Sequence, residues 1–591
     1  MLPFKSKDKY LRTKYIINLS TLVPFLLFSI VLFFICLVAL NKDFSTSHPN
    51  FFTYCLFGYG CLGAILIIIL IIPKWLVKRH YKNMWILEMM EIAYKKYLQS
   101  LPKVVFVYTV HNDFQPTRLL QSMQQTYKNF EVWISDGSSK IEISNAIKEF
   151  ASKNNIHLFK MNTPSVDKAD NLNTFLKTTK VKFDYLLFSD SDVAIHKEFV
   201  ATALNYFYNP NFKHVGYVSS YIQNYPLPTL FSKYTHWTET SFFYLSDVFK
   251  NLGNNAAARV WSSCCLIKKD VLDELGGFPS GSLEDLYIEL DASKLCWAGL
   301  VCPLTTSMQH FDRSESDCLR RLLRVHDWAA RYFNTKQFKK YNDQYHETYD
   351  QIIGYTHTGL YALLGIIGAG VIVPTIVIFA PIIFTTNGVV EYINIFQILA
   401  IVIPVGTALI CASIVGTVNA MHIIGFWRGI ICAPFGLFWV LNFSIHFIYH
   451  YFKATVRKKY TTFKETRQAR ENETSGKKKI AMKAEWIILA CTIPVLVLAN
   501  TLFFYFNALH LNTDHYDQYK YFWYLILFID ITVGYLLFAA ISGLLLQAAS
   551  KIKVKDLYPE DKFVYNTNKV TDFRKVKDKF YKQHPEYERR Y

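Results

Sequence analysis

The stretch Val104–Val110 reads VVFVYTV, a continuous run of apolar, β-branched and aromatic residues. Such a run is typical of a strand buried on both faces of a parallel sheet, because it lacks the polar alternation of a half-exposed strand. A helix-like stretch follows at residues 117–128, and further apolar strands are predicted at 130–134 (FEVWI) and 185–188 (YLLF). Strands that alternate with helices predict an α/β domain with a mainly parallel central sheet.

The composition indicates that this domain is part of a larger membrane protein. Of the 591 residues, 51% are hydrophobic and only 19% are charged, whereas soluble domains average about 25% charged residues. These values exclude a disordered chain and a collagen-like repeat. The 11 cysteines form no Cys-x-x-Cys pair, which argues against structural zinc and a disulfide framework and favours buried thiols. The net charge of +18 gathers beside the apolar stretches, so we expect no nucleic-acid partner.

Seven apolar stretches are candidates for membrane segments, each long enough for the roughly 20 residues of a spanning helix. Two precede the α/β domain, at Ile16–Leu40 and Phe51–Pro73, and basic residues flank their outer ends. Both outer flanks are therefore predicted to be cytoplasmic. The other five follow the domain, at Gly359–Phe384, Tyr392–Val418, Gly429–Tyr451, Glu485–Leu509 and Tyr521–Ala549.

Charge decides which of the five C-terminal stretches cross. The basic segment 453–484 and the Lys-rich tail 551–591 should both be cytoplasmic. One stretch must then re-enter or lie in the interface, and we assign this to residues 421–451, which contain Arg428 and Pro434. The prediction is a multi-pass plasma-membrane protein with about six transmembrane helices, interfacial helices, and a cytoplasmic soluble domain and termini. Its domains are 1–82 (two spans), 83–350 (soluble), 351–550 (membrane region) and 551–591 (tail).

Carboxylates follow two of the predicted strands. Ser135 and Asp136 come directly after the strand FEVWI, and Asp190 and Asp192 follow the strand YLLF. In parallel sheets, ligands bind at the carboxyl ends of the strands. Two carboxylates one residue apart can hold Mg²⁺ or Mn²⁺, which also binds diphosphate oxygens. The alternative is a solvated surface turn.

Two later motifs also carry charge. Glu284 and Asp285 precede a helix-like stretch, where a carboxylate can act as a general base or simply cap the helix. Residues 320–331 form a basic and aromatic amphipathic helix, which suits a membrane surface and anionic phosphates alike.

In their order, these motifs resemble those of the membrane-integrated processive family 2 glycosyltransferases, of the cellulose synthase and hyaluronan synthase type. The resemblance implies a GT-A-like domain between membrane segments. It implies that Asp136 contacts the uracil of a UDP-sugar and that Lys168, in the stretch KADNLN, neighbours the diphosphate. It further implies that Asp190 and Asp192 bind the metal, and that Asp285, with Glu284 beside it, is the catalytic base.

The resemblance also implies an acceptor site and a gating loop. Acceptor contacts would come from Trp261, Ser263, Cys264 and Trp328. The family has an Arg immediately before this last Trp, but the chain has Asp327, so the diphosphate charge would pass to Arg324, Arg321, Arg331 or the metal. The gating loop would contain Phe463, Thr466 and Arg467, although a basic juxtamembrane loop explains these residues equally well.

The function implied by the resemblance is inverting, processive transfer from a UDP-hexose, for which we name UDP-glucose. The expected partners are the donor, a growing β-linked polysaccharide such as a capsule glucan, and the bilayer; the oligomeric state stays open. One alternative is a glycolipid synthase of the ceramide glucosyltransferase type, which adds a single sugar to a lipid. Another is a non-catalytic transporter that binds nucleotide sugars.

Overall fold

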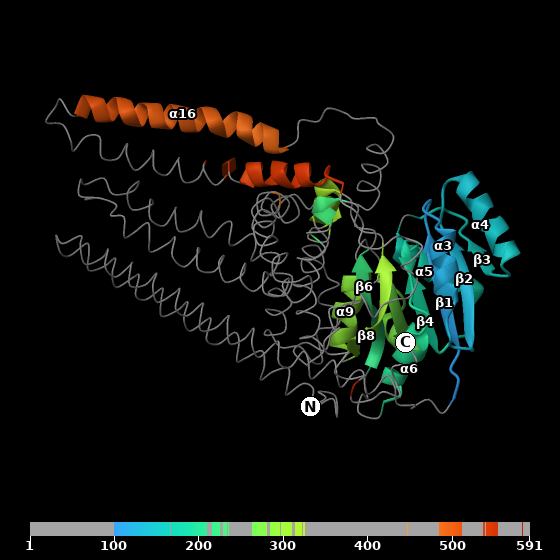
Figure 1. Cartoon of the computed structure of the whole chain (residues 1–591). Helices are drawn as coiled ribbons and strands as arrows, with labels where there is room; N and C mark the ends of the chain where they lie inside the picture. Colours follow the sequence, from blue (N-terminus) through green and yellow to red (C-terminus); the bar gives the residue numbers. More distant parts are fainter. Residues whose placement is uncertain are drawn as a thin grey trace, which may run out of the picture.

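A computed structural model of the chain describes the α/β domain and parts of the C-terminal region (Figure 1). The described residues are 100–165, 167–209, 215–224, 229–232, 235, 263–279, 284–295, 297–309, 314–321, 323–324, 446, 484–510, 533, 536–537, 539–553 and 582. The predicted spans at 16–40, 51–73, 359–384 and 392–418 lie outside these residues, as do the basic segment 453–483 and, apart from residue 446, the segment 421–451.

Eight strands form one sheet in the order β3-β2-β1-β4-β7-β6-β8-β5. The strands are β1 (Val104–Val110), β2 (Phe130–Asp136), β3 (His157–Lys160), β4 (Tyr185–Ser189), β5 (Val193–Ala194), β6 (Val215–Asn224), β7 (Cys264–Lys268) and β8 (Ala298–Gln309). The helices are α3 (Pro116–Met123), α4 (Ile141–Lys153), α5 (Lys168–Thr179), α6 (Phe199–Phe207), α8 (Lys269–Leu275), α9 (Glu284–Lys294) and α16 (Ala484–His510).

The first half of the sheet is parallel. β1 pairs with β2 on one side and β4 on the other, and β3 extends the sheet beyond β2. All seven residues of β1 are buried, as the run VVFVYTV predicts. The register places Asp136 opposite Val110 and Ser189 opposite Tyr108. β2 and β4 therefore end on either side of the end of β1. Asp136 is the last residue of β2, and Asp190 directly follows β4.

The second half of the sheet is mixed. β7 runs antiparallel to both β4 and β6, β8 is parallel to β6 with register shifts, and β5 is antiparallel to β8. Most of the pairings are parallel, so the prediction of an α/β domain with a mainly parallel sheet is confirmed. The helix that corresponds to the predicted stretch 117–128 is α3, which already ends at Met123. Beyond it, the N–H of Thr126 donates to the carbonyl of Lys197 and not to a carbonyl of the helix.

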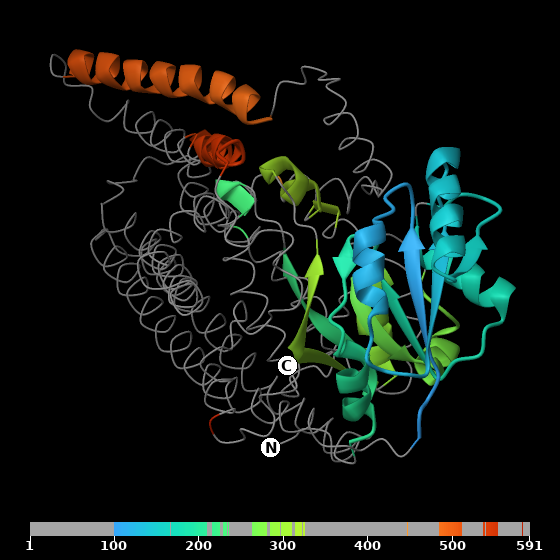
Figure 2. The same cartoon turned by 45° about the vertical axis from the view of Figure 1, so that its right-hand side comes forward.

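Helices cover both faces of the sheet, and each face has its own hydrophobic core (Figures 1 and 2). On one face, Phe106 of β1 belongs to a cluster with Leu119 of α3 and Phe199 of α6. On the other, Val105 belongs to a cluster with Phe175 of α5 and Ile288 of α9. The second core therefore joins α5 and α9, the two helices whose first turns carry Lys168 and Glu284.

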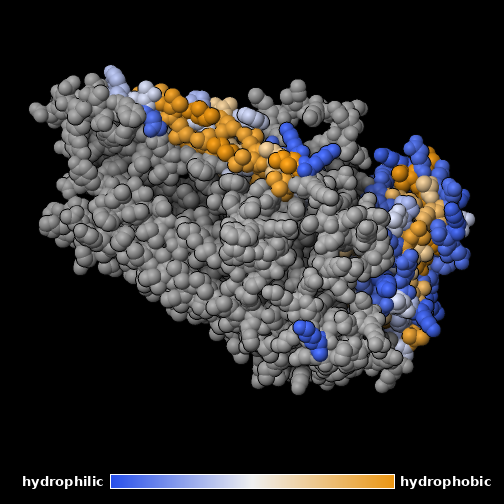
Figure 3. Space-filling model, in the orientation of Figure 1, coloured by the Kyte–Doolittle hydropathy of each residue, from blue (hydrophilic) through white to orange (hydrophobic). Residues whose placement is uncertain are grey.

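The C-terminal region contributes the 27-residue helix α16, which coincides with the stretch predicted at 485–509. Several of its apolar side chains are exposed, among them Trp486, Val497 and Leu498, and they form an apolar band on the surface (Figure 3). In the part of the chain that the structure describes, no helix meets the length and hydropathy required to cross a bilayer. Membrane insertion therefore stays a prediction.

The end of the C-terminal helical segment 539–549 contacts residues that border the α/β domain. The N–H of Glu315 donates to Ser550 Oγ at 2.9 Å, and the N–H of Leu230 donates to the carbonyl of Ile552 at 2.9 Å. Thr229 and Lys553 form an isolated antiparallel bridge. Segments far apart in the sequence are thus joined next to β6 and β8.

Candidate active site

Asp136 ends β2 and is only 1% exposed, yet both of its oxygens accept hydrogen bonds. Oδ1 accepts from the N–H of Ser138 at 2.8 Å, and Oδ2 accepts from Lys160 Nζ at 2.9 Å. Burial acts to raise the pKa of Asp136, but the hydrogen bonds from Ser138 and Lys160 lower it below its ordinary value. Asp136 is therefore a fixed negative charge at this edge of the sheet.

The turn after β1 is tied to the turn after β2 through Asn112. This residue adopts a positive φ of 59°, which Asn tolerates better than most side chains. Its Oδ1 accepts hydrogen bonds from the N–H groups of Ser139 and Lys140, both at 3.0 Å, and His111 Nδ1 contacts the carbonyl of Gly137 at 2.8 Å. Sequence reasoning missed this connection, although a His-Asn-Asp triplet directly after a buried strand is a signal for it.

Lys168 begins α5 and reaches Asp190, which follows β4. Asp167 caps the helix by accepting from the N–H of Ala169 at 3.0 Å, so the helix starts here. Lys168 Nζ lies 2.6 Å from Asp190 Oδ1 and 5.2 Å from the centre of the Phe188 ring. Burial acts to lower the pKa of Lys168, but the negative charges of Asp190, Glu284 and Asp285 raise it. One buried ammonium group therefore faces both acidic motifs.

Glu284 and Asp285 form the first turn of α9. Glu284 is 7% exposed. Burial, followed by the charge of Asp285, raises the pKa of Glu284 to about 8, while the charge of Lys168 acts to lower it. Glu284 lies next to the candidate base Asp285, which is half-buried.

Asp192 lies between Asp190 and β5, close to the end of β1. The hydroxyl of Tyr108 donates to the carbonyl of Ser191, and burial together with the charges of Asp113 and Asp192 raises the pKa of Tyr108. The four residues Lys168, Asp190, Glu284 and Asp285 thus meet at the carboxyl edge of the sheet, with Asp192 beside them and Asp136 across β1.

The carboxylates of Asp190 and Asp192 suit a hard divalent cation that also takes ligands from a bound substrate. Among the described residues, no group of three or more His, Cys, Asp or Glu side chains is placed to hold a metal. Asp190 and Asp192 offer two carboxylates, and the ammonium of Lys168 shows that Asp190 accommodates a cation. Oxygen ligands from a bound diphosphate and water would complete the coordination of Mg²⁺ or Mn²⁺.

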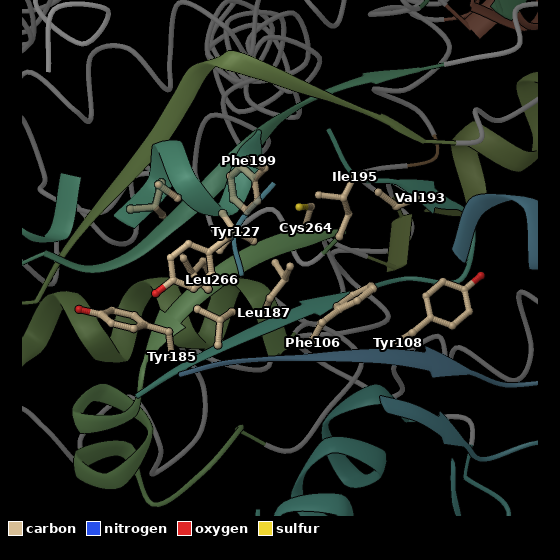
Figure 4. Close-up of a cluster of buried hydrophobic side chains, with 14 of the residues drawn as sticks. Phe106, Tyr108, Tyr127, Tyr185, Leu187, Val193, Ile195, Phe199, Cys264 and Leu266 are labelled. Atoms are coloured by element: carbon tan, nitrogen blue, oxygen red, sulfur yellow. The ribbon is translucent and has the colours of Figure 1, made fainter. Parts of the chain in front are cut away.

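The predicted acceptor residues divide into two groups. Ser263 precedes β7, and its Oγ donates to Gln309 Oε1 at 3.0 Å. Cys264 is fully buried, and Figure 4 shows it among apolar side chains that include Phe199 and Ile195. The geometry does not favour an acceptor contact by the Cys264 thiol, because the alternating side chains of β7 direct it into the core. Trp261 and Trp328 lie outside the described residues, as do Asp327, Arg331, Phe463, Thr466 and Arg467.

Arg321 and Arg324 lie after β8, in the helical residues 315–321 and 323–324. Arg321 Nη2 is 3.6 Å from Cys318 Sγ on the same segment. The segment also contacts the C-terminal helical region through Glu315 and Ser550. The donor-binding role of the two arginines stays a prediction.

Comparisons with known proteins identify the domain. Residues 113–276 match the family model described as glycosyl transferase family 2. No curated protein matches the chain in sequence. Solved structures that resemble it include a mannosyltransferase from Pyrobaculum calidifontis in complex with GDP-Man and Mn²⁺, at 14% identity, with 67% of this chain and 99% of that chain covered and a TM-score of 0.39.

A second similar structure is the glucosyl-3-phosphoglycerate synthase from Mycobacterium tuberculosis in complex with Mn²⁺, UDP and phosphoglyceric acid, at 13% identity, with 38% of this chain and 76% of that chain covered and a TM-score of 0.29. The matched segment 113–276 contains Asp136, Lys168, Asp190 and Asp192, and Glu284 follows it closely. Residues 113–276, within the α/β domain, therefore match a glycosyl transferase family 2 domain.

Proposed function

We propose that the chain is an inverting, metal-dependent glycosyltransferase that polymerises UDP-glucose into a β-linked polysaccharide at the plasma membrane. The observation that carries the proposal is the position of Lys168, whose Nζ lies 2.6 Å from Asp190 and in the field of Glu284 and Asp285. Donor-side and acceptor-side motifs, distant in sequence, therefore act on one reaction centre. A solvated turn at Asp190 or a simple helix cap at Asp285 does not explain this convergence.

The residues divide the chemistry among them. Asp285 accepts the proton of an acceptor hydroxyl as its oxygen forms a bond to the anomeric carbon of the donor. The bond from that carbon to the diphosphate breaks at the same time, so an α-linked donor gives a β-linked product. Lys168 neutralises part of the charge on the departing nucleotide diphosphate. A divalent cation held by Asp190 and Asp192 would neutralise more of it.

Glu284 has a different part from Asp285. Burial and the charge of Asp285 raise the pKa of Glu284, which favours a proton shared by the two neighbouring carboxyl groups. One neutral and one ionised carboxyl group can lie side by side without strong repulsion. One proton shared by the pair therefore leaves one carboxylate to act as the base, the role that we assign to Asp285.

The membrane part of the proposal rests on sequence and on one surface. Long apolar stretches flank the domain, basic segments lie where cytoplasmic loops are predicted, and the exposed apolar side chains of α16 form a continuous band (Figure 3). A polymer needs a route across the bilayer, which these segments would supply. A glycolipid synthase would share the reaction centre but not the need for that route.

The test is incorporation from a panel of labelled donors in membranes that contain the full chain. UDP-glucose, UDP-galactose, UDP-N-acetylglucosamine, UDP-glucuronic acid and GDP-mannose are compared, with and without a chelator of divalent cations. We expect a high-molecular-weight product from UDP-glucose, cleaved by a β-glucanase and lost on chelation. A product that extracts into organic solvent with a single sugar would instead establish the glycolipid synthase. An absence of nucleoside diphosphate release, UDP or GDP, with every donor would establish a non-catalytic protein.

A further inference from the structure

We propose that Asn173 is a positioning residue that fixes the candidate base motif relative to the donor-binding helix; the inference rests on the proposed function for the role of Asp285. Its side-chain amide makes two hydrogen bonds with the backbone of one distant residue, Phe278. Asn173 Nδ2 donates to the carbonyl of Phe278 at 2.7 Å, and the N–H of Phe278 donates to Asn173 Oδ1 at 2.8 Å. These bonds join α5 to a turn 105 residues further along the chain.

The turn is shaped to receive this amide. Gly276 and Gly277 follow α8 and have φ angles of 75° and 105°, in the region that favours glycine. A Cβ atom at Gly277 would lie 2.6 Å from Asn173 Oδ1. The absence of a side chain at Gly277 therefore lets the amide approach the backbone of Phe278 closely enough to form both bonds.

The same turn is packed against the strand that carries the metal-binding candidates. Phe278 is 3% exposed, and its ring meets that of Phe188 edge to face, at 5.1 Å and 86°. Phe188 also lies 5.2 Å below the ammonium of Lys168 and two positions before Asp190. Asn173, Phe278 and Phe188 thus connect α5, the turn before α9, and β4.

The position of this connection points to its role. Lys168 and Asn173 lie on one helix, whereas Glu284 and Asp285 follow Phe278 after five intervening residues. Holding the peptide of Phe278 fixes the point from which the chain runs to the base motif. Asn173 is suited to this because an amide donates and accepts at once, which neither carboxylate nor hydrocarbon side chains of similar size can do.

The structure predicts a defect in reaction geometry rather than in donor affinity. Asn173→Asp keeps an acceptor for the N–H of Phe278 but sets a carboxylate against its carbonyl oxygen, and Asn173→Leu removes both bonds. A misplacement of about 1 Å at a reaction centre costs about 100-fold in rate. We therefore expect kcat to fall by about 10- to 100-fold in either variant, with the KM for UDP-glucose and the affinity for UDP changed less than about threefold.

The experiment uses the full chain purified in detergent, with Asn154→Asp as the matched control. Asn154 also donates from its amide to one backbone carbonyl, that of Phe150 at 2.8 Å, but lies at the end of α4. Kinetic constants, UDP binding and melting temperature are measured for the two Asn173 variants, for Asn154→Asp and for Gly277→Ala. Gly277→Ala, which displaces the same amide, should reproduce the fall in kcat, and Asn154→Asp should not.

Amide hydrogen exchange separates this proposal from the proposed function. In both Asn173 variants, exchange in residues 276–290 should be about tenfold faster, with residues 104–110 unchanged. If no nucleotide sugar is turned over by the wild type, the proposed function fails while the exchange pattern still tests the connection. The inference is overturned if kcat and exchange stay at wild-type values, or if kcat, UDP affinity and melting temperature all fall together as in a general loss of folding.

Discussion

The end of β2 and the start of α9 each bury a carboxylate, and the protein shifts the two pKa values in opposite directions. The pKa of Asp136 is lowered because a backbone N–H and the ammonium of Lys160 donate hydrogen bonds to its oxygens, which outweighs the effect of burial. The pKa of Glu284 is raised, first by burial and then by the like charge of Asp285. The opposite charge of Lys168 does not compensate for these two effects. Burial alone therefore does not decide the charge of a carboxylate; the donors around it do.

This difference matches what the two regions are proposed to do. A donor site needs a charge that stays the same throughout the reaction. Asp136 supplies it, with hydrogen bonds from Ser138 in the turn after β2 and from Lys160 at the end of β3. A reaction centre must exchange protons near neutral pH, and a pair of neighbouring carboxyl groups at a helix start can do so. The variants below change one region and leave the other as it is.

The largest effect is expected from Asp285→Asn, which removes the candidate base and leaves the donor side intact. Loss of general base catalysis lowers rates by about 10²- to 10⁴-fold. We expect the rate of sugar transfer to fall by that factor, while UDP binding stays within about twofold of wild type. Initial rates and equilibrium binding measure the two quantities. The matched control is Asp270→Asn on α8, an exposed acid paired with Lys268, which should transfer normally; near-normal polymer formation by Asp285→Asn would refute the base assignment.

A smaller effect, on stability, is expected from Glu284→Gln. Because the folded-state pKa of Glu284 is raised to about 8 from an ordinary value of 4.5, the folded protein binds the extra proton between these values. Wild-type stability should therefore fall as pH rises through this window, by at most about 1.4 kcal/mol per pH unit. Glu284→Gln removes this dependence, so the variant should be more stable than wild type at pH 9 and similar to it at pH 4.

Melting temperatures measured from pH 4 to pH 9 test this prediction. Asp136→Asn serves as the opposing variant, because a lowered folded-state pKa gives stability that is present above the unfolded pKa and lost in acid. Asp136→Asn should therefore be less stable than wild type at pH 7, and the difference should shrink on acidification. If Glu284→Gln were less stable than wild type at pH 9, the ionised form of Glu284 would stabilise the folded protein. The pKa values of Asp136 and Glu284 would then not be shifted in opposite directions.

The sequence predicts the two regions unequally, and the reason is physical. The run VVFVYTV and the acids after YLLF are local signals, and the structure places β1, Asp136 and Asp190 where those signals predict. The partners that set the charges are not local: Lys160, Lys168 and Asn173 reach their partners across strands or across the turn before α9. Cys264 shows the same limit, since the side of β7 that faces the core depends on its pairing with β4 and β6, which the run CCLIK alone does not specify.

The smallest effect is expected from Lys160→Met, which weakens the donor region alone. Lys160 Nζ donates to Asp136 Oδ2, Ser138 O and Ser144 Oγ, at 2.9, 2.8 and 2.6 Å. The carboxylate of Asp136 keeps its bond from the N–H of Ser138, and the Lys160 side chain is 42% exposed, so water compensates for part of the loss. We expect a loss of about 1 kcal/mol at pH 7 in urea unfolding, less than the roughly 1.5–3 kcal/mol of a hydrogen bond to a charged group. Because this loss depends on an ionised Asp136, it should disappear as pH falls through the lowered pKa of that carboxyl. The control variant Lys148→Met, on the exposed face of α4, should show no loss of stability at either pH. A loss from Lys160→Met that persisted in acid would mean that Lys160 stabilises the turn through Ser138 and Ser144 instead.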